Sequence, residues 1–110
     1  MGDLNKKIEI IKKACEDKNG EDIVILDVSK QTTIAECFII VSANSPLQMN
    51  AISDSVDEQM SNHGYEQLYR EGQKSSGWML LDYNDCIVHI FLKDEREYYD
   101  LERLWENMNN

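Results

Sequence analysis

Apolar side chains recur every three or four residues in three parts of the chain, the pattern of a helix that buries one face. The amino-terminal set is Leu4, Ile8, Ile11 and Cys15. The middle set is Met49, Ile52, Val56 and Met60. The carboxy-terminal set is Tyr98, Leu101, Leu104, Trp105 and Met108. We therefore expect three helices, the last with Tyr98, Leu101 and Trp105 in the core and Tyr99 pointing elsewhere as a candidate contact.

Residues that stop and start helices flank the first two sets. Asn19 and Gly20 follow the first set, and both residue types can adopt the left-handed conformation after a helix end. Ahead of the middle set, Ser45 is placed to cap a helix and Pro46 fits a first helical turn. Gln48, three residues after Ser45, completes a capping box, so the middle helix is predicted to begin here.

Shorter stretches have the composition of β-strands. Residues 23–28 and 37–41 are almost continuously apolar, which predicts two strands covered on both faces, or nearly so. Residues 65–70 alternate weakly and predict a short edge strand, and residues 78–82 and 86–91 predict a hairpin. The predicted order is α-β-β-α-β-β-β-α, an α/β fold in one domain that spans the whole chain.

The predicted hairpin divides its side chains between two faces. With residues 83–85 as the loop, Asp82 pairs with Cys86 and Trp78 pairs with Ile90. One face then carries Trp78, Leu80, Cys86, Val88 and Ile90. The other carries Met79, Leu81, Ile87, His89 and Phe91. Both faces are apolar, and three helices are few for about five strands, so we expect part of one face to be left for another molecule.

The charge of the chain restricts its partners. Eleven basic and twenty-one acidic residues give a formal net charge of −10. Such an excess repels phosphate backbones, whose binding depends on Lys and Arg. We therefore expect no direct binding of nucleic acid and a basic protein as the natural partner.

Cysteine usage and the absence of long apolar runs indicate a cytoplasmic protein. The three cysteines stand far apart, which is typical of reduced thiols and not of a disulfide framework or zinc site. The first residues are polar, unlike a signal peptide, and no run approaches the ~18 apolar residues of a membrane span.

Candidate catalytic chemistry is sparse. We interpret His89 as a hydrogen-bonded core histidine and expect the thiols of Cys37 and Cys86, within apolar runs, to have raised pKa values and to be inert. Asp82 and Asp85 flank the hairpin turn and could share a divalent ion, although turn aspartates more often bond their own backbone. With no glycine-rich phosphate loop, we expect no catalytic residue, no cofactor and no metal.

Trp78 is the most informative single residue. It is either an ordinary core aromatic or the anchor of an interface, since tryptophan is enriched at interface hot spots. In the second interpretation, Glu71, Asp82 and Asp85 supply an acidic rim that would suit Arg or Lys of a basic partner.

Several stretches together resemble one known family. They are Gly-Glu-Asp-Ile-Val-Ile-Leu-Asp-Val at 20–28, Ala-Glu-Cys-Phe-Ile-Ile at 35–40, Asn44-Ser45, Glu71-Gly72, Gly-Trp-Met-Leu-Leu-Asp-Tyr at 77–83, Asp-Cys-Ile-Val-His-Ile-Phe at 85–91 and the run from Glu95 to Trp105. In this order they resemble the ribosomal silencing factor family, also called Iojap-like or RsfS. The resemblance covers nearly the whole chain.

The resemblance implies a fold and a partner. The fold is similar to that of nucleotidyltransferases, with a mixed sheet of five strands and flanking helices. The implied partner is the basic large-subunit ribosomal protein number fourteen, where binding blocks subunit joining and lowers translation when nutrients are short. The family's strand tryptophan corresponds to Trp78, and Leu80 and Asp82 accompany it on the same face. Family members can self-associate, so we expect a possible homodimer that competes with ribosome binding.

Two alternatives remain open from the sequence. A small metal-dependent nucleotidyltransferase would use a close pair of strand aspartates beside a Gly-Ser turn. This chain has Asn44-Ser45 at that turn and no Asp-x-Asp, which argues against an enzyme. The other alternative is a subunit of some complex other than the ribosome.

Overall fold

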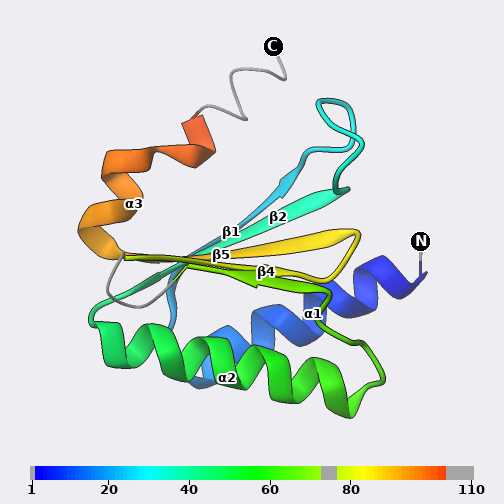
Figure 1. The fold of residues 1–110 in the computed structure, drawn as a ribbon, viewed down its shortest axis with the longest axis horizontal. Coiled ribbons are helices and arrows are strands. Elements are labelled where there is room, and N and C mark those ends of the chain that lie inside the picture. Colours follow the sequence, from blue (N-terminus) through cyan, green and yellow to red (C-terminus); the bar gives the residue numbers. More distant parts are fainter. Residues whose placement is uncertain (1, 73–76, 104–110) are drawn as a thin grey trace.

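The computed structural model describes residues 2–72 and 77–103, which form a sheet with helices on both of its faces (Figure 1). The elements in chain order are α1 (Gly2–Asp17), β1 (Glu21–Asp27), β2 (Cys37–Ala43), α2 (Pro46–Asn62), β3 (Tyr69–Glu71), β4 (Trp78–Asp82), β5 (Cys86–Leu92) and α3 (Lys93–Tyr99). The predicted α/β class and order of elements are confirmed. Among the described residues, no helix combines the length and the apolar character that crossing a bilayer requires.

The five strands form one mixed sheet in the order β1-β2-β5-β4-β3. β2 and β5 run parallel at its centre, and the other neighbouring pairs are antiparallel. The central strand β2 is buried at every residue, as its continuous apolar run predicts. The prediction that residues 23–28 are covered on both faces is wrong, because β1 lies at the edge of the sheet and Ile25 is 42% exposed.

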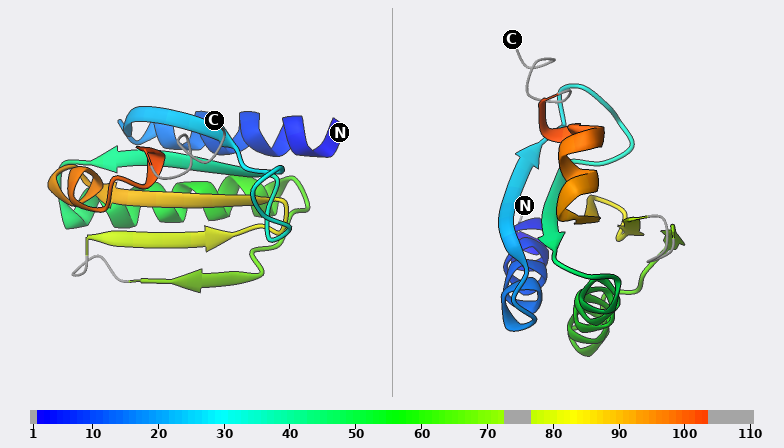
Figure 2. Two further views of the ribbon diagram at one scale, coloured as in Figure 1. Left: turned by 90° about the horizontal axis from the view of Figure 1, so that it is seen from above. Right: turned by 90° about the vertical axis from the view of Figure 1, so that its left-hand side faces the viewer.

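The helices divide unequally between the two faces of the sheet. Figure 2 shows α1 and α2 side by side against one face, whereas the short α3 lies on the other. The predicted face of α2, made by Met49, Ile52, Val56 and Met60, is fully buried in the larger core cluster. Ile11 and Cys15 of α1 join the same cluster, together with Val88 of β5. One face is therefore closed by two long helices and the other only in part.

Gln48 joins the start of α2 to the end of α1. The backbone N–H of Gln48 donates to Ser45 Oγ at 3.1 Å, so Ser45 caps α2 as predicted. The Gln48 side chain accepts from the N–H of Asn44 at 2.7 Å, one residue earlier than in a capping box. Its amide nitrogen also donates to the carbonyls of Lys18 and Asn19.

The predicted register of the hairpin is wrong by one residue. Asn84 adopts a φ of 79°, which lets the chain turn in two residues, and the N–H of Tyr83 donates to the carbonyl of Cys86 at 2.8 Å. Trp78 therefore pairs with Phe91 and not with Ile90. Since neighbouring residues of a strand point to opposite faces, the side chains that share a face with Trp78 are Leu80, Asp82, Ile87, His89 and Phe91.

The carboxy-terminal helix is shorter than its apolar spacing predicts. Asp100 adopts a left-handed conformation with a φ of 48° and ends α3, so the phase of the pattern is lost there. Tyr98, in the last turn of α3, is 81% exposed, and its predicted place in the core is wrong. Leu101 packs against the smaller core cluster, as expected. Leu104, Trp105 and Met108 lie outside the described residues.

Gly20 is required for a close approach between elements. Asn19, with a φ of 62°, supplies the left-handed residue after α1, whereas Gly20 needs no unusual φ. A Cβ on Gly20 would lie 2.6 Å from Val41 Cγ2 and 3.0 Å from the carbonyl oxygen of Cys15. The end of α1 can thus reach β2 only because this residue has no side chain.

We predict that Gly20→Ala lowers the free energy of unfolding by about 1–3 kcal/mol, because the added methyl group overpacks the core. Urea unfolding of the wild type, Gly20→Ala, Val41→Ala and the double variant measures this. The contact with Val41 makes the double variant less destabilised than the sum of the two single changes. Strictly additive changes would contradict the steric explanation.

Candidate functional site

The face of the sheet opposite α1 and α2 has a small core and an open part. Val28, Ala35, Phe38 and Ile87 form a second buried cluster on this side. Leu80 of β4 lies at its margin and is only partly buried. The open part is where α3 ends and β4 and β3 complete the sheet, so any partner that covers this face meets these elements first.

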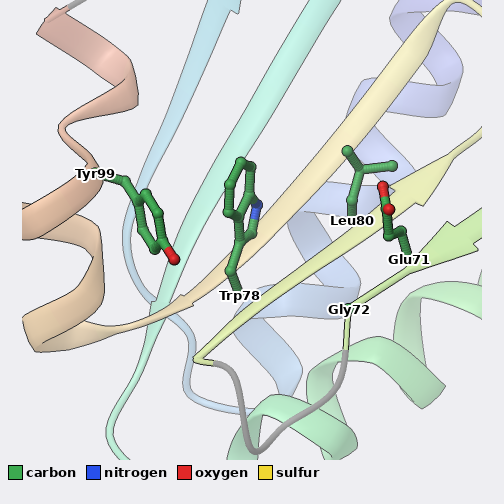
Figure 3. Close-up of a pocket in the computed structure, with 5 residues that line it drawn as sticks. All are labelled: Glu71, Gly72, Trp78, Leu80 and Tyr99. Carbon is green, nitrogen blue, oxygen red and sulfur yellow. The ribbon is translucent and has the colours of Figure 1, made fainter.

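A pocket of about 290 Å³ lies on the open part of this face (Figure 3). Its lining residues are Glu71, Gly72, Trp78, Leu80 and Tyr99. The side chains of Trp78, Leu80 and Glu71 rise to the same side of the sheet, and the ring of Tyr99 approaches from α3. The structure thus brings together four of the five residues that the sequence singled out, from three separate elements.

Trp78 is held by neighbouring rings while one part of it remains exposed. Its indole lies 4.8 Å from the Tyr99 ring and 5.2 Å from the Phe91 ring, measured between centroids. Its Nε1–H donates to His89 Nδ1 at 3.2 Å. An aromatic side chain fixed in this way loses little conformational freedom when a partner covers it.

His89 is a buried, neutral histidine that orients Trp78. It is 3% exposed, and burial lowers its pKa from the ordinary 6.5 to about 4. Since Nδ1 accepts the indole hydrogen bond, the proton belongs on Nε2, which is buried without a hydrogen-bond partner among the described residues. This agrees with the interpretation of His89 as a core histidine. The contact with Trp78 was not predicted, because the predicted hairpin register placed the two side chains on opposite faces of the sheet.

Gly72, which belongs to the Glu71-Gly72 motif but was not predicted as a site residue, lines the pocket. Its φ is 87°, and a Cβ there would lie 2.1 Å from the carbonyl oxygen of Trp78. Gly77 has a φ of 76°, and a Cβ added to it would lie 2.5 Å from Cγ of Glu95. Both positions therefore require glycine, because a side chain would collide with Trp78 or Glu95. In the sequence, only the Glu-Gly and Gly-Trp pairs of the motifs pointed to these two glycines.

Arg96 holds α3, and with it Tyr99, against the sheet. Its Nη1 donates to Ser42 Oγ of β2 at 2.8 Å, and its Nε donates to Glu102 Oε1 at 2.6 Å. The Arg96 side chain is only 11% exposed, so these charge-assisted bonds are shielded from water. Lys93 of the same helix pairs with Glu21 at 3.6 Å through exposed side chains.

Asp82 and Asp85 do not join the pocket. Asp82 lies on the face of Trp78 but at the other end of β4, and its carboxylate accepts from the N–H of Asn84 at 2.8 Å. Asp85 accepts from Lys7 Nζ of α1 at 2.8 Å. The two carboxylates thus have separate partners, and of the expected acidic rim only Glu71 lines the pocket with Trp78.

The thiols differ from the expectation that burial alone raises their pKa values. Burial raises the pKa of Cys15 to about 12 and contributes to a raised pKa at Cys86. The hydrogen bond between the Cys37 and Cys86 thiols, whose Sγ atoms are 3.1 Å apart, lowers the pKa of Cys37. The expected rise in pKa is therefore wrong for Cys37, whereas its lack of reactivity stays a prediction. Within the described ranges, no group of three or more His, Cys, Asp or Glu side chains could hold a metal ion.

Comparison with known proteins decides the family. Residues 2–110 match the family model described as "Ribosomal silencing factor during starvation". The chain is 39% identical over 104 residues to the ribosomal silencing factor RsfS of Bacillus subtilis, covering 93% of this chain and 88% of that protein. The chain belongs to the ribosomal silencing factor family. The resemblance stated from the sequence is confirmed.

Other members of the ribosomal silencing factor family support the fold and the wider relationship. A crystal structure of a protein from Chromobacterium violaceum superposes with a TM-score of 0.89 at 34% identity, covering 93% of this chain and 85% of that one. The chloroplastic protein Iojap of Zea mays is 33% identical over 95 residues, 86% of this chain and 41% of that longer protein. The family carries the name of a silencing factor and not of an enzyme.

We predict a pH dependence of stability that originates at His89. The unfolded chain protonates this histidine near pH 6.5, whereas the folded protein resists protonation down to about pH 4. The unfolded state therefore binds more protons in this window, and the free energy of unfolding falls as the pH falls from 6.5 towards 4, by at most about 3 kcal/mol. Urea unfolding measured across this range gives the slope.

His89→Asn keeps an acceptor for Trp78 and removes the titrating group, so its stability curve should be flatter between pH 6.5 and 4. Carboxylates elsewhere titrate alike in both proteins and cancel in the comparison. His63→Asn, at the exposed end of α2, makes the same substitution away from Trp78 and is the matched control. Parallel curves for His89→Asn and the wild type would contradict this assignment.

We predict that Arg96→Met loosens the wall of the pocket. The change leaves buried Ser42 and the carboxylate of Glu102 without this donor, at a cost of about 1–3 kcal/mol. In a Trp105→Phe background, where Trp78 is the only indole, acrylamide should quench its fluorescence more strongly. Lys93→Met should have little effect because its ion pair is exposed. Equal quenching in both variants would show that Arg96 does not hold Tyr99 in place.

Proposed function

We propose that this protein silences translation by binding the large ribosomal subunit through its protein number fourteen and by blocking the approach of the small subunit. The observation that carries this proposal is the pocket in which Trp78 is fixed by surrounding rings but left partly open. Membership of the silencing factor family supports it. The mechanism is steric exclusion without catalysis, and it acts when nutrients are short.

The composition of the pocket supports a protein partner. Tryptophan and tyrosine are enriched among the residues that dominate binding energy, and here Trp78 and Tyr99 stand beside Leu80. Glu71 adds a carboxylate at the margin, where it would suit a basic side chain. An aromatic centre with a polar border is the usual arrangement of a protein interface.

The charge of the chain supports contact with ribosomal protein and not with ribosomal RNA. A formal net charge of −10 repels a phosphate backbone and attracts a basic protein. A complex with a dissociation constant of 1 nM requires about 12 kcal/mol, which one interface of ordinary size can supply. Blocking subunit joining therefore needs only affinity and position.

We also infer that a homodimer, where it forms, uses the same face and competes with ribosome binding. The pocket lies on the side of the sheet that α3 covers only in part. A second copy on this face would bury Trp78 and Tyr99. The cytoplasm, where ribosomes assemble from their subunits, is the expected location.

Cosedimentation with isolated ribosomal subunits tests the proposed function. We expect the protein to pellet with large subunits and not with small subunits, and to lower the yield of joined ribosomes. Trp78→Ala should weaken binding to the large subunit by about 2 kcal/mol, or roughly 30-fold, because it removes the centre of the contact. Tyr99→Ala, at an exposed position, should act in the same direction with less effect on folding.

Leu47→Ala is the matched control, because Leu47 is an exposed apolar residue on α2, behind the other face of the sheet. It should bind like the wild type. Circular dichroism must show that each variant is folded. Wild-type affinity in folded Trp78→Ala and Tyr99→Ala would remove the pocket from the interface, and absence of binding by the wild type would remove the ribosome as partner.

We predict that association with the large subunit slows as the salt concentration rises. An acidic protein and a basic surface attract one another over a distance set by the Debye length, about 10 Å at 0.1 M salt. Stopped-flow measurement of the association rate at several salt concentrations tests this. A rate that does not depend on salt would indicate that charge has no part in recognition.

A further inference from the structure

Cys37 and Cys86 form a thiol pair at the end of the sheet opposite the pocket. They are the first residues of β2 and β5 and lie directly opposite each other in the parallel pair at the centre of the sheet. Their Sγ atoms are 3.1 Å apart. Both thiols are free, and the third cysteine, Cys15, lies buried in α1.

The backbone geometry suits a bond between these two sulfurs. Neighbouring strands lie about 4.7–4.9 Å apart, which falls within the Cα separation of about 4.4–6.8 Å found across disulfides. Both side chains point to the same face, since they belong to the same larger core cluster. The sulfurs need to approach by roughly 1 Å to reach the S–S length of about 2.05 Å.

The two thiols are chemically unequal. The hydrogen bond between the two thiols lowers the pKa of Cys37, whereas this bond and burial raise the pKa of Cys86. Cys37 is thus the better nucleophile, because the thiolate is the reactive form. Cys37 is 4% exposed and follows residues 35 and 36, so it lies next to a surface loop.

We propose that Cys37 and Cys86 are an oxidation site that closes to an intramolecular disulfide when the protein meets hydrogen peroxide. The Cys37 thiolate attacks one peroxide oxygen, which breaks the O–O bond and gives a sulfenic acid and hydroxide. Cys86 sulfur then attacks the sulfenic sulfur, forms the S–S bond and releases the second oxygen as water. Overall, two thiols lose two hydrogen atoms and one peroxide becomes two waters.

The disulfide would join the two central strands without closing the pocket. The cysteines are 49 positions apart in the sequence, so the bond would restrict the unfolded chain and raise the thermal unfolding temperature. The pocket lies near Phe91, at the other end of β5, so oxidation should leave partner binding unchanged. The proposal therefore stands independently of the proposed ribosomal function.

Intact mass and thiol counts after treatment with hydrogen peroxide test the proposal. The mass of the disulfide-linked peptide pair from the wild type should be lower by two hydrogen atoms than that of the two separate peptides. After denaturation, the oxidised protein should show one free thiol in place of three. Peptide mapping should join Cys37 to Cys86. Cys15→Ala is the matched control and should form the same bond.

Two variants separate the steps. Cys86→Ser keeps a hydroxyl donor beside Cys37 Sγ but cannot form the S–S bond, so it should leave a sulfenic acid on Cys37 that dimedone traps. Cys37→Ala should suppress reaction at Cys86. Three retained thiols in the wild type while its methionines become sulfoxides would overturn the proposal. Bonds that involve Cys15 or a second chain, or sulfinic acid without a bond, would overturn it too. Because the wild-type peptide map decides the result, a variant that fails to fold does not affect the test.

Discussion

The hydrogen bond from the N–H of Tyr83 to the carbonyl of Cys86 decides on which face of the sheet Trp78 lies. This bond closes a two-residue turn and places Trp78 opposite Phe91. A hairpin with one more residue in its turn would shift β4 by one position against β5. Trp78 would then lie with Val88 and Ile90 beneath α1 and α2, as a core residue without access to a partner. The candidate site thus depends on one turn.

This register places Trp78 on the face of the sheet that the helices cover less. Two long helices close one face, whereas the other is covered by a helix of seven residues that Arg96 holds to β2. α3, which ends at Asp100, contacts one side of Trp78 through Tyr99, and Trp78 is only partly buried. A partly exposed aromatic cluster on a sheet face is typical of a site for another molecule.

The family resemblance implies a fold similar to that of nucleotidyltransferases, whose chemistry depends on a close pair of aspartates. The aspartates nearest the hairpin turn are engaged by the N–H of Asn84 and by Lys7, so they support the turn and its contact with α1. A fold can keep its sheet and helices while different residues give it a different role. Here the described residues offer an aromatic pocket and a thiol pair at opposite ends of the same sheet.

Local sequence determined the elements of this protein but not their alignment. Apolar spacing predicted α1, α2 and the order of the strands along the chain. It could do so because a buried helix face or a buried strand leaves its pattern in consecutive residues. The motifs also indicated the family and Trp78, strand alternation and nearby acidic residues indicated Leu80 and Glu71, and helical spacing indicated Tyr99. Only the tertiary structure decided that these four meet while Asp82 lies apart, that α3 ends at Asp100, and that Cys37 meets Cys86. The physical reason is that register, turn length and the pairing of distant strands depend on single hydrogen bonds and on packing between elements, which a local pattern of residues does not contain.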